Sequence, residues 1–299
     1  MYTNKTKIFG ILGFPLGHTL SPWIHNTLFE YSKYDGVYLV FENEEWPKLG
    51  LSPLKIAGVK GLSVTIPFKE WAFQIASSAC EASKTMKASN TLLFEGEEII
   101  AKNTDGEGAL RSILETDPSL LSPKDSSTIL VLGSGGSAKG ILFSLVKHLQ
   151  SKKNFKTDKK PAKKIRILAR NHIAVSDMIQ SLGVEGIVSA ISNEEVYDHK
   201  EDISLVIHTT PVGMKGVGGD TLLEKHFFHK EMTLFDIVYN PLETELVKLA
   251  KAKRSKIIPG YSMLLYQGIR QFEYFTKLEV EKKWIKKIEK ILLSQLKNR

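Results

Sequence analysis

The sequence predicts an α/β protein made of two units, and three observations support this fold class. Short apolar runs alternate with helical patterns over most of the 299 residues, as expected when helices cover the faces of a sheet. The run Ile129–Leu132 is unbroken, which is typical of a strand buried in a parallel sheet. From about Tyr261 the pattern is wholly helical. We therefore expect a doubly wound parallel sheet in the second unit and a closing set of helices.

The first unit is predicted to be β-α-β-α-β with an added hairpin. A strand at 6–16 runs into a Gly-Pro turn, and a helix follows at 21–34, with Ser21 as N-cap and Pro22 in the first helical position. Strands at 36–43 and 59–68 flank a partly helical segment at 46–58. We expect one helix over 69–86 and a hairpin over 89–106, turning at Glu95-Gly96.

The second unit is predicted to alternate strands and helices from 107 to 260. A helix at 107–115 precedes the buried strand, and further strands are expected at 164–170, 205–210 and 234–240. The C-terminal segment carries apolar residues at helical spacing, which indicates a docking helix with a basic outer face. These residues are Trp284, Ile285, Ile288, Ile291, Leu292 and Leu296. We assign 1–106 and 261–299 to the first unit.

The net charge of +8 is concentrated in two segments. Residues 151–164 carry a net +6 and residues 281–299 a net +5, which leaves −3 for the rest of the chain. The first is expected to be a solvated loop. Neither segment interleaves lysines with stacking aromatic residues, as single-strand binding proteins do. We therefore expect no nucleic-acid partner.

The composition favours a cytoplasmic protein. A single cysteine, Cys80, excludes an intrachain disulfide. No stretch approaches the roughly 18 apolar residues of a membrane helix, and the first residues do not resemble a signal peptide. We expect no membrane association and no metal.

A glycine-rich turn follows the buried strand and opens a helix. Residues Gly133, Ser134, Gly135, Gly136, Ser137 and Ala138 fit G-x-G-x-x-G/A. The first glycine makes the turn, the second lets the backbone approach a pyrophosphate, and the third small residue lets helix and strand pack closely. The helix N-terminus offers free N–H groups to phosphates. This is the context expected of a Rossmann-type dinucleotide site.

The next strand ends at Arg170, where NAD-binding proteins usually place an acidic residue. No acidic residue follows until Asp177. Because an arginine at this position accommodates the 2′-phosphate, the sequence favours NADP. The lysines of 151–164 precede the strand and belong to the opposite edge of the sheet, so they are not assigned to this phosphate.

Polar side chains gather at strand ends of the first unit. Thr19 and Ser21 stand just before a predicted helix, where two hydroxyls beside free N–H groups suit a carboxylate. Ser21 is equally well explained as a helix cap. Further polar residues at apolar strand ends are Ser63, Thr65, Lys69, Asn90, Asn103, Thr104 and Asp105.

The stretches that carry these residues resemble the shikimate dehydrogenase family, which reduces 3-dehydroshikimate to shikimate with NADPH in aromatic amino-acid biosynthesis. The matching stretches, nearly end to end and in family order, are GFPLGHTLSPWIHN, GLSVTIPFKE, ASNTL, NTDG, VLGSGGSAKG, TTPVGM, DIVYNPLETELV and GYSMLLYQGIRQF. The resemblance implies an N-terminal substrate domain, a Rossmann-type NADP domain at 107–260, and C-terminal helices that return to the substrate domain.

The resemblance also implies residue roles. Lys69 would be the proton donor and acceptor, and Asp105 would align it. The implied substrate-binding residues are Thr19, Ser21, Ser63, Thr65, Asn90, Tyr239 and Gln267. The implied cofactor-binding residues are the six of the glycine-rich turn together with Arg170, Thr210, Val238 and Gly260.

Three positions depart from the family pattern and leave alternatives open. The family usually has serine where Thr19 stands, asparagine where Ser63 stands, and a second basic residue where Ala174 stands. The alternatives are a quinate/shikimate dehydrogenase that uses NAD and a catalytically inactive regulatory relative. The sequence leaves the oligomeric state open between monomer and homodimer.

Overall fold

The structure, a computed structural model, describes residues 3–122, 125–151, 163–219 and 221–297. The chain divides into two compact units. Unit 1 comprises Met1–Asp105 with Leu265–Arg299, and unit 2 comprises Gly106–Leu264. The predicted boundaries lie within four residues of these limits.

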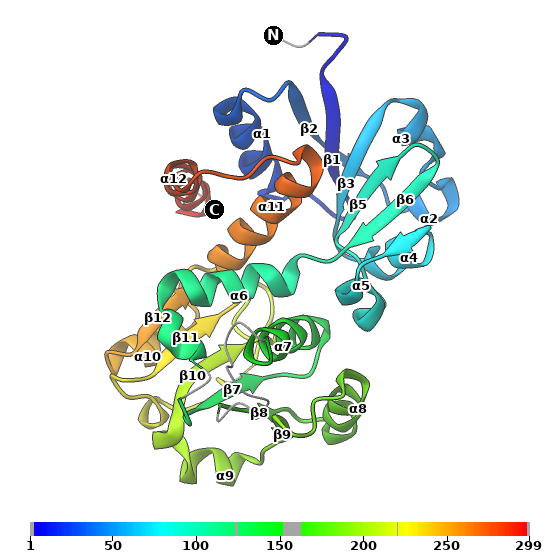
Figure 1. Ribbon diagram of the computed structural model, residues 1–299. Helices are drawn as coiled ribbons and strands as arrows, with labels where there is room; N and C mark the ends of the chain where they lie inside the picture. The colour runs from blue at the N-terminus through cyan, green and yellow to red at the C-terminus, as the bar shows by residue number, and fades with distance from the viewer. Residues whose placement is uncertain (1–2, 123–124, 152–162, 220, 298–299) are drawn as a thin grey trace. The chain divides into compact units, whose positions relative to one another are not determined.

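Unit 1 is built on a mixed six-stranded sheet with the order β2-β1-β3-β5-β6-β4 (Figure 1). Its strands are β1 (Lys7–Gly13), β2 (Gly36–Glu42), β3 (Val59–Val64), β4 (Ser78–Ala79), β5 (Thr91–Glu95) and β6 (Glu98–Lys102). Its helices are α1 (Ser21–Ser32), α2 (Trp46–Leu49), α3 (Ser52–Ile56), α4 (Lys69–Gln74), α5 (Glu81–Met86) and α12 (Lys282–Lys297). Helix α11 (Gly260–Thr276) begins in unit 2 and ends in unit 1.

The two faces of this sheet are covered by different helices. Leu12, Leu62 and Val64 point to the face that α2, α3 and α4 cover, whereas Phe9 stacks on Phe29 of α1 and on Phe275 of α11 on the other face. This alternation follows from the two-residue period of a strand. The polar residues of β3 that matter below therefore share a face with α1 and α11.

The segment 69–86, predicted as one helix, is divided into α4, β4 and α5. Ser78 and Ala79 pair in parallel with Ile100 and Ala101 of β6 and extend the sheet edge. Cys80 then caps α5, since its Sγ accepts a bond from Ser83 N–H at 3.4 Å. The single-helix prediction was wrong because this pairing partner lies about twenty residues away in the sequence.

The prediction that Ser21 caps α1 was also wrong. Leu20 occupies the N-cap position without a side-chain cap bond, and Ser21 is already helical. Instead, Thr19 Oγ1 accepts the Ser21 N–H at 3.3 Å. The Ser21 hydroxyl is therefore not used as a cap.

Unit 2 contains a six-stranded parallel sheet with the order β12-β11-β10-β7-β8-β9, which confirms the predicted doubly wound fold. Its strands are β7 (Thr128–Leu132), β8 (Lys164–Leu168), β9 (Val188–Ala190), β10 (Ile203–His208), β11 (Thr233–Asp236) and β12 (Lys256–Pro259). Its helices are α6 (Asp105–Thr116), α7 (Gly136–Leu149), α8 (His172–Leu182), α9 (Asn193–Asp198) and α10 (Glu245–Ala252), with short 3₁₀ turns at Pro118–Leu121, Lys200–Asp202 and Lys225–Phe227.

Both faces of the parallel sheet are buried. Ile129 and Val131 pack with α6, α7 and α8 on one face, while Leu130 and Leu132 pack with α9 and α10 on the other. A strand that is buried on both sides must be apolar throughout, which explains the unbroken run in the sequence.

The lysine-rich segment was predicted to be a solvated loop, and residues 152–162 of it lie outside the described residues. Lys163 contradicts the prediction because its side chain is fully buried. Its Nζ bonds to Asp125 and to Ser127 Oγ, the latter at 2.7 Å. A buried ammonium of this kind requires such partners.

The predicted C-terminal docking helix is α12. Ile285, Ile288, Leu292 and Leu296 are buried, and α12 packs against α1 of the same unit. In the described part of the chain, no helix is long and apolar enough to cross a membrane.

Candidate active site

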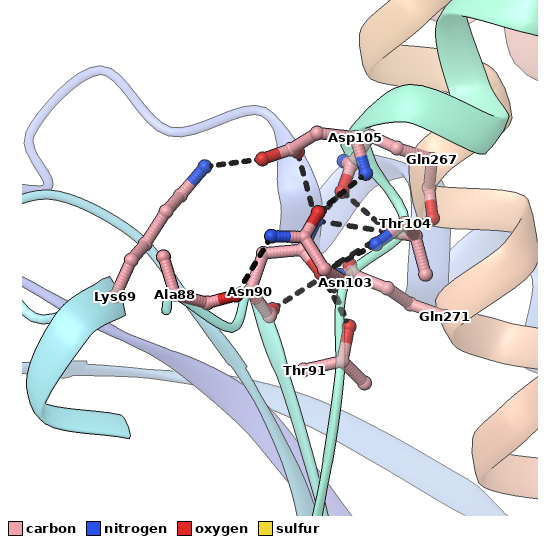
Figure 2. Close-up of polar contacts among 9 residues, drawn as sticks. All are labelled: Lys69, Ala88, Asn90, Thr91, Asn103, Thr104, Asp105, Gln267 and Gln271. Atoms are coloured by element: carbon pink, nitrogen blue, oxygen red, sulfur yellow. Dashed lines mark hydrogen bonds and ion pairs between the residues drawn. The ribbon is translucent and has the colours of Figure 1, made fainter. Parts of the chain in front are cut away.

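Lys69 and Asp105 form an ion pair in unit 1. Lys69 is the first residue of α4, just after the turn that ends β3, and Asp105 is the first residue of α6. Lys69 Nζ lies 2.7 Å from Asp105 Oδ2 (Figure 2). The side chains are 31% and 23% exposed, so both remain accessible to a small molecule. An ammonium has three protons, and therefore Lys69 has others to offer besides the one that Asp105 accepts.

Asn90 holds the carboxylate of this pair in place (Figure 2). Its Nδ2 donates to Asp105 Oδ1 at 2.8 Å and to Thr104 Oγ1 at 2.9 Å, and Gln267 Oε1 lies 3.3 Å away. Its Oδ1 accepts from Thr104 N–H at 2.9 Å and from Thr91 Oγ1 at 2.8 Å. Because Asn90 is buried, these bonds fix its orientation, and through it the position of Asp105.

The turn before α6 adds two further contacts. Asn103 Oδ1 accepts the Asp105 N–H at 3.1 Å, and Asn103 Nδ2 donates to Ala88 O at 3.0 Å. Thr104 Oγ1 donates to Gln267 O at 3.2 Å. The structure therefore brings Lys69, Asn90, Asp105 and Gln267 together, as their predicted shared site requires.

The other predicted substrate-binding residues occupy different parts of the fold. Thr19 is half-buried and Ser21 is buried at the start of α1. Ser63 and Thr65 lie two residues apart along the β3 segment and so share a face. Tyr239 follows β11 and belongs to unit 2, whereas the other six belong to unit 1.

Ser63, a predicted site residue, belongs to a buried polar cluster next to this site whose other members were missed in the sequence. Ser63 Oγ donates to Gln271 Oε1 at 2.7 Å. His25 stacks on Tyr38 with ring centroids 4.1 Å apart, and both side chains are fully buried. The only sequence signal was Gln271 four residues after Gln267 on an otherwise apolar helix face.

Burial determines the charge state of this cluster. It lowers the pKa of His25 from 6.5 to about 3 and raises the pKa of Tyr38 well above its usual value. The Gln271 amide offsets a smaller part of the His25 shift, although neither imidazole nitrogen reaches hydrogen-bond geometry with a described residue. His25 is therefore neutral and Tyr38 protonated near pH 7.

In unit 2 the glycine-rich turn has the shape expected of a phosphate cradle. Gly133 has φ +108°, and a Cβ there would lie 2.8 Å from both Thr209 Oγ1 and Thr210 Cγ2. Gly135 is the N-cap of α7, and a Cβ on Gly135 would meet nothing within 4 Å. Ala138 is fully buried where α7 meets the sheet. The turn therefore leaves space at the helix N-terminus that suits a pyrophosphate.

Arg170 is exposed just beyond β8. The following Asn171 is committed to capping α8, because its Oδ1 accepts the Ala174 N–H at 3.0 Å. Arg170 is thus the charged side chain that this loop presents. Among the described residues, no group of three or more His, Cys, Asp or Glu side chains is arranged to hold a metal ion.

His208, at the end of β10, connects the two loops that carry other predicted cofactor-binding residues. Its Nδ1 lies 2.9 Å from Asp236 Oδ1, and its Nε2 lies 2.6 Å from Thr210 Oγ1. Asp236 Oδ1 also accepts the Val238 N–H at 3.0 Å. His208 and Asp236 were not predicted, because their pairing depends on β10 and β11 being neighbours in the sheet.

Gly260 is required by close packing beside the second of these loops. A Cβ on Gly260 would lie 2.5 Å from Val238 O and 2.6 Å from Ile237 O. The first residue of α11 therefore packs directly on the backbone of residues 237–238, and only glycine fits there.

Together, a Rossmann-type unit and an α/β unit with a lysine–carboxylate pair define the chain as a nicotinamide-dependent oxidoreductase. Residues 11–92 match the sequence profile of the shikimate dehydrogenase substrate binding domain. A shikimate dehydrogenase (NADP(+)) of Leptospira interrogans serogroup Icterohaemorrhagiae serovar Lai is 45% identical over 300 residues, covering 99% of each chain. The chain therefore belongs to the shikimate dehydrogenase family.

Solved structures agree with this assignment. A shikimate dehydrogenase in complex with NADP⁺ superposes with a TM-score of 0.81 at 28% identity and covers 96% of each chain. The shikimate dehydrogenase of Aquifex aeolicus superposes with a TM-score of 0.80 at 31% identity, covering 97% of this chain and 99% of that one.

Proposed function

We propose that the chain catalyses the reversible, NADP-dependent reduction of 3-dehydroshikimate to shikimate. The observation that carries this proposal is the Lys69–Asp105 pair at 2.7 Å, accessible yet fixed through Asn90. A relative with this activity in its name matches 99% of the chain. The same reaction serves aromatic amino-acid biosynthesis.

Lys69 is the proposed proton donor to the ketone oxygen, and the proton acceptor in the reverse direction. Asp105 accepts a hydrogen bond from Lys69 Nζ through Oδ2 and one from Asn90 Nδ2 through Oδ1. Because both carboxylate oxygens are held in this way, Asp105 fixes the direction in which the ammonium points. Proton transfer by a positioned side chain is typically worth about 10²–10⁴ in rate. Asp105 acts as an aligner in this proposal.

Thr19 and Ser21 are the proposed carboxylate ligands. Thr19 Oγ1 accepts the Ser21 N–H, so its own proton is available to an anion, and Ser21 is not used as a cap. Both stand at the N-terminus of the twelve-residue helix α1, whose dipole favours negative charge. Thr65, Asn90, Asp105 and Gln267 are proposed to bond the ring hydroxyls, and Ser63 and Tyr239 are proposed as further substrate-binding residues.

The residues of unit 2 fit NADP. The residues from Gly133 to Ala138 would hold the pyrophosphate, Arg170 the 2′-phosphate, and Thr210, Val238 and Gly260 would border the remainder. When bound, NADPH supplies the hydride. Because one arginine supplies the only charged contact proposed for the 2′-phosphate, the preference for NADP over NAD depends on that side chain.

A steady-state assay tests the proposal. The purified chain is offered shikimate or quinate with NADP or NAD, and reduced cofactor is followed by absorbance. We expect the highest kcat/KM for shikimate with NADP. Higher kcat/KM for quinate with NAD, or no turnover of any pair, would overturn the proposed function.

A further inference from the structure

Ser63 of β3 and Gln271 of α11 form a buried polar pair beside the Asn90 cluster. Ser63 bonds Gln271, and a Cβ on Gly61 would lie 2.8 Å from the Phe275 ring. Gln267, Gln271 and Phe275 recur every four residues on one face of α11. The pair Ser63–Gln271 is therefore one helical turn below Gln267, which contacts the Asn90 cluster.

The orientation of the Gln271 amide is fixed by its neighbours. Its Nε2 donates to Asn90 O at 2.9 Å and to Thr91 Oγ1 at 3.1 Å. A backbone carbonyl can only accept, so the NH₂ group must face Asn90. The amide oxygen consequently faces Ser63.

This orientation commits the hydroxyl of Ser63. A hydroxyl has one proton, and Ser63 donates it to Gln271 Oε1 at 2.7 Å. Ser63 Oγ then has only acceptor capacity left. An asparagine, which the family usually has at this position, can donate through its NH₂ group as well as accept through its Oδ1, so the committed serine lacks a donor that the family residue has.

Tyr38 brings a further hydroxyl close to Ser63. Its hydroxyl lies close to the hydroxyls of Ser63 and Ser21 but has no hydrogen-bond partner among the described residues. The side chain is fully buried, and a buried phenol can still donate its proton. A hydroxyl oxygen has two acceptor lone pairs, so Ser63 can accept a bond from Tyr38 and still accept one from a substrate hydroxyl.

We propose that Gln271 is a positioning residue that makes Ser63 an obligate acceptor, so that the enzyme requires a hydroxyl donor at one substrate ring position. The inference rests on the proposed function and deepens it by naming a specificity element of the substrate site. Gln271 acts here through Ser63, and Ser63 is the residue that meets the substrate.

Substrate analogues test the polarity directly. In each analogue, one non-reacting ring hydroxyl of shikimate is replaced by hydrogen or by fluorine, which accepts weakly but cannot donate. At one ring position we expect the wild type to lose about threefold to tenfold in kcat/KM with either analogue, the loss typical of one neutral hydrogen bond. The loss should fall mainly on KM.

Gln271→Met removes the amide while keeping the length of the side chain. Without the Gln271 amide, the Ser63 hydroxyl can donate to a fluorine of the substrate. The kcat/KM for the fluoro analogue should therefore rise relative to that for the deoxy analogue at the same ring position. Thr276→Val is the matched control, since it removes a buried hydroxyl at the end of α11 that bonds Phe272 O and the Leu278 N–H and not Ser63. It should leave the ratio of fluoro to deoxy turnover as in the wild type.

Ser63→Ala provides a second test that does not depend on the folding of Gln271→Met. At the same ring position, shikimate and its deoxy analogue should become nearly equal substrates of Ser63→Ala. If the wild type turns over shikimate but Ser63→Ala still discriminates as the wild type does, the inference is overturned. An unchanged fluoro-to-deoxy ratio in folded Gln271→Met overturns it equally, whereas a wild type inactive on shikimate overturns the proposed function itself.

Discussion

His25 is a titratable side chain that unit 1 keeps uncharged in its core. Burial lowers its pKa to about 3 in the folded chain, whereas an unfolded histidine titrates near 6.5. Below pH 6.5 the unfolded chain therefore binds a proton that the folded chain does not. The stability that this group contributes is fully present above pH 6.5 and is lost as the pH falls toward 3, by about 1.4 kcal/mol per unit.

The variant His25→Phe should remove this pH dependence while keeping a ring against Tyr38. Between pH 7.5 and pH 5, we expect the free energy of unfolding of the wild type to fall by about 2 kcal/mol more than that of the variant. Urea unfolding at the two pH values measures this difference. His226→Asn, at an exposed histidine, should behave as the wild type, and equal losses in wild type and His25→Phe would contradict the assignment.

Arg170 is the residue on which the cofactor preference should depend. Replacing it by serine removes the charge-assisted bonds to a 2′-phosphate, so we expect KM for NADP to rise about tenfold to a hundredfold. KM for NAD should change little because NAD lacks that phosphate. Lys253→Ser, at another exposed cation of unit 2, serves as the control. A parallel rise of both KM values would remove Arg170 from this role.

At the scale of elements, the two glycines that open α7 should fail differently when changed to alanine. Gly135→Ala adds a Cβ to open space, so the fold should lose about 1 kcal/mol at most, while NADPH affinity falls at least about tenfold as the backbone can no longer approach the phosphates. Gly133→Ala should instead cost about 1–3 kcal/mol, because of its positive φ and its contact with Thr209 and Thr210. Thermal melting and NADPH titration separate the two effects, and normal NADPH affinity in Gly135→Ala would contradict the cradle.

The elements that the sequence predicted well are those whose signal is local. The strand β7, the glycine-rich turn and α7 lie within about twenty consecutive residues, so their pattern is visible in the local sequence. The apolar face of α12 is likewise predicted by the helical spacing of its apolar residues. The β4 strand was missed because two residues carry no period, and its pairing with β6 is decided by the tertiary fold. Lys163 was misjudged because its partner Asp125 lies 38 residues away.

The site follows the same rule. Polar residues at strand ends indicated Lys69, Asn90 and Asp105, and the structure places them in contact. Gln271 could not be found in this way, since Ser63 is 208 residues distant and glutamine on a helix is ordinary. The pair His208–Asp236 was likewise hidden until β10 and β11 were known to be adjacent.

At the scale of the whole molecule, turnover requires both units, because unit 1 carries the proposed proton donor and unit 2 the proposed cofactor site. A variant that lacks the Lys69 side chain should still bind substrate and cofactor, but its proton-transfer step should be slow. We therefore expect Lys69→Ala to retain the fold and near-normal KM values.

The most direct test of this account is the rate of NADPH formation from shikimate by the wild type and by Lys69→Ala, with Lys84→Ala as the control at an exposed lysine of α5. We predict that Lys69→Ala loses about 10²–10⁴ in kcat with little change in KM, while Lys84→Ala retains wild-type kinetics. A Lys69→Ala enzyme with near-normal kcat and only a raised KM would contradict the role of Lys69 in proton transfer.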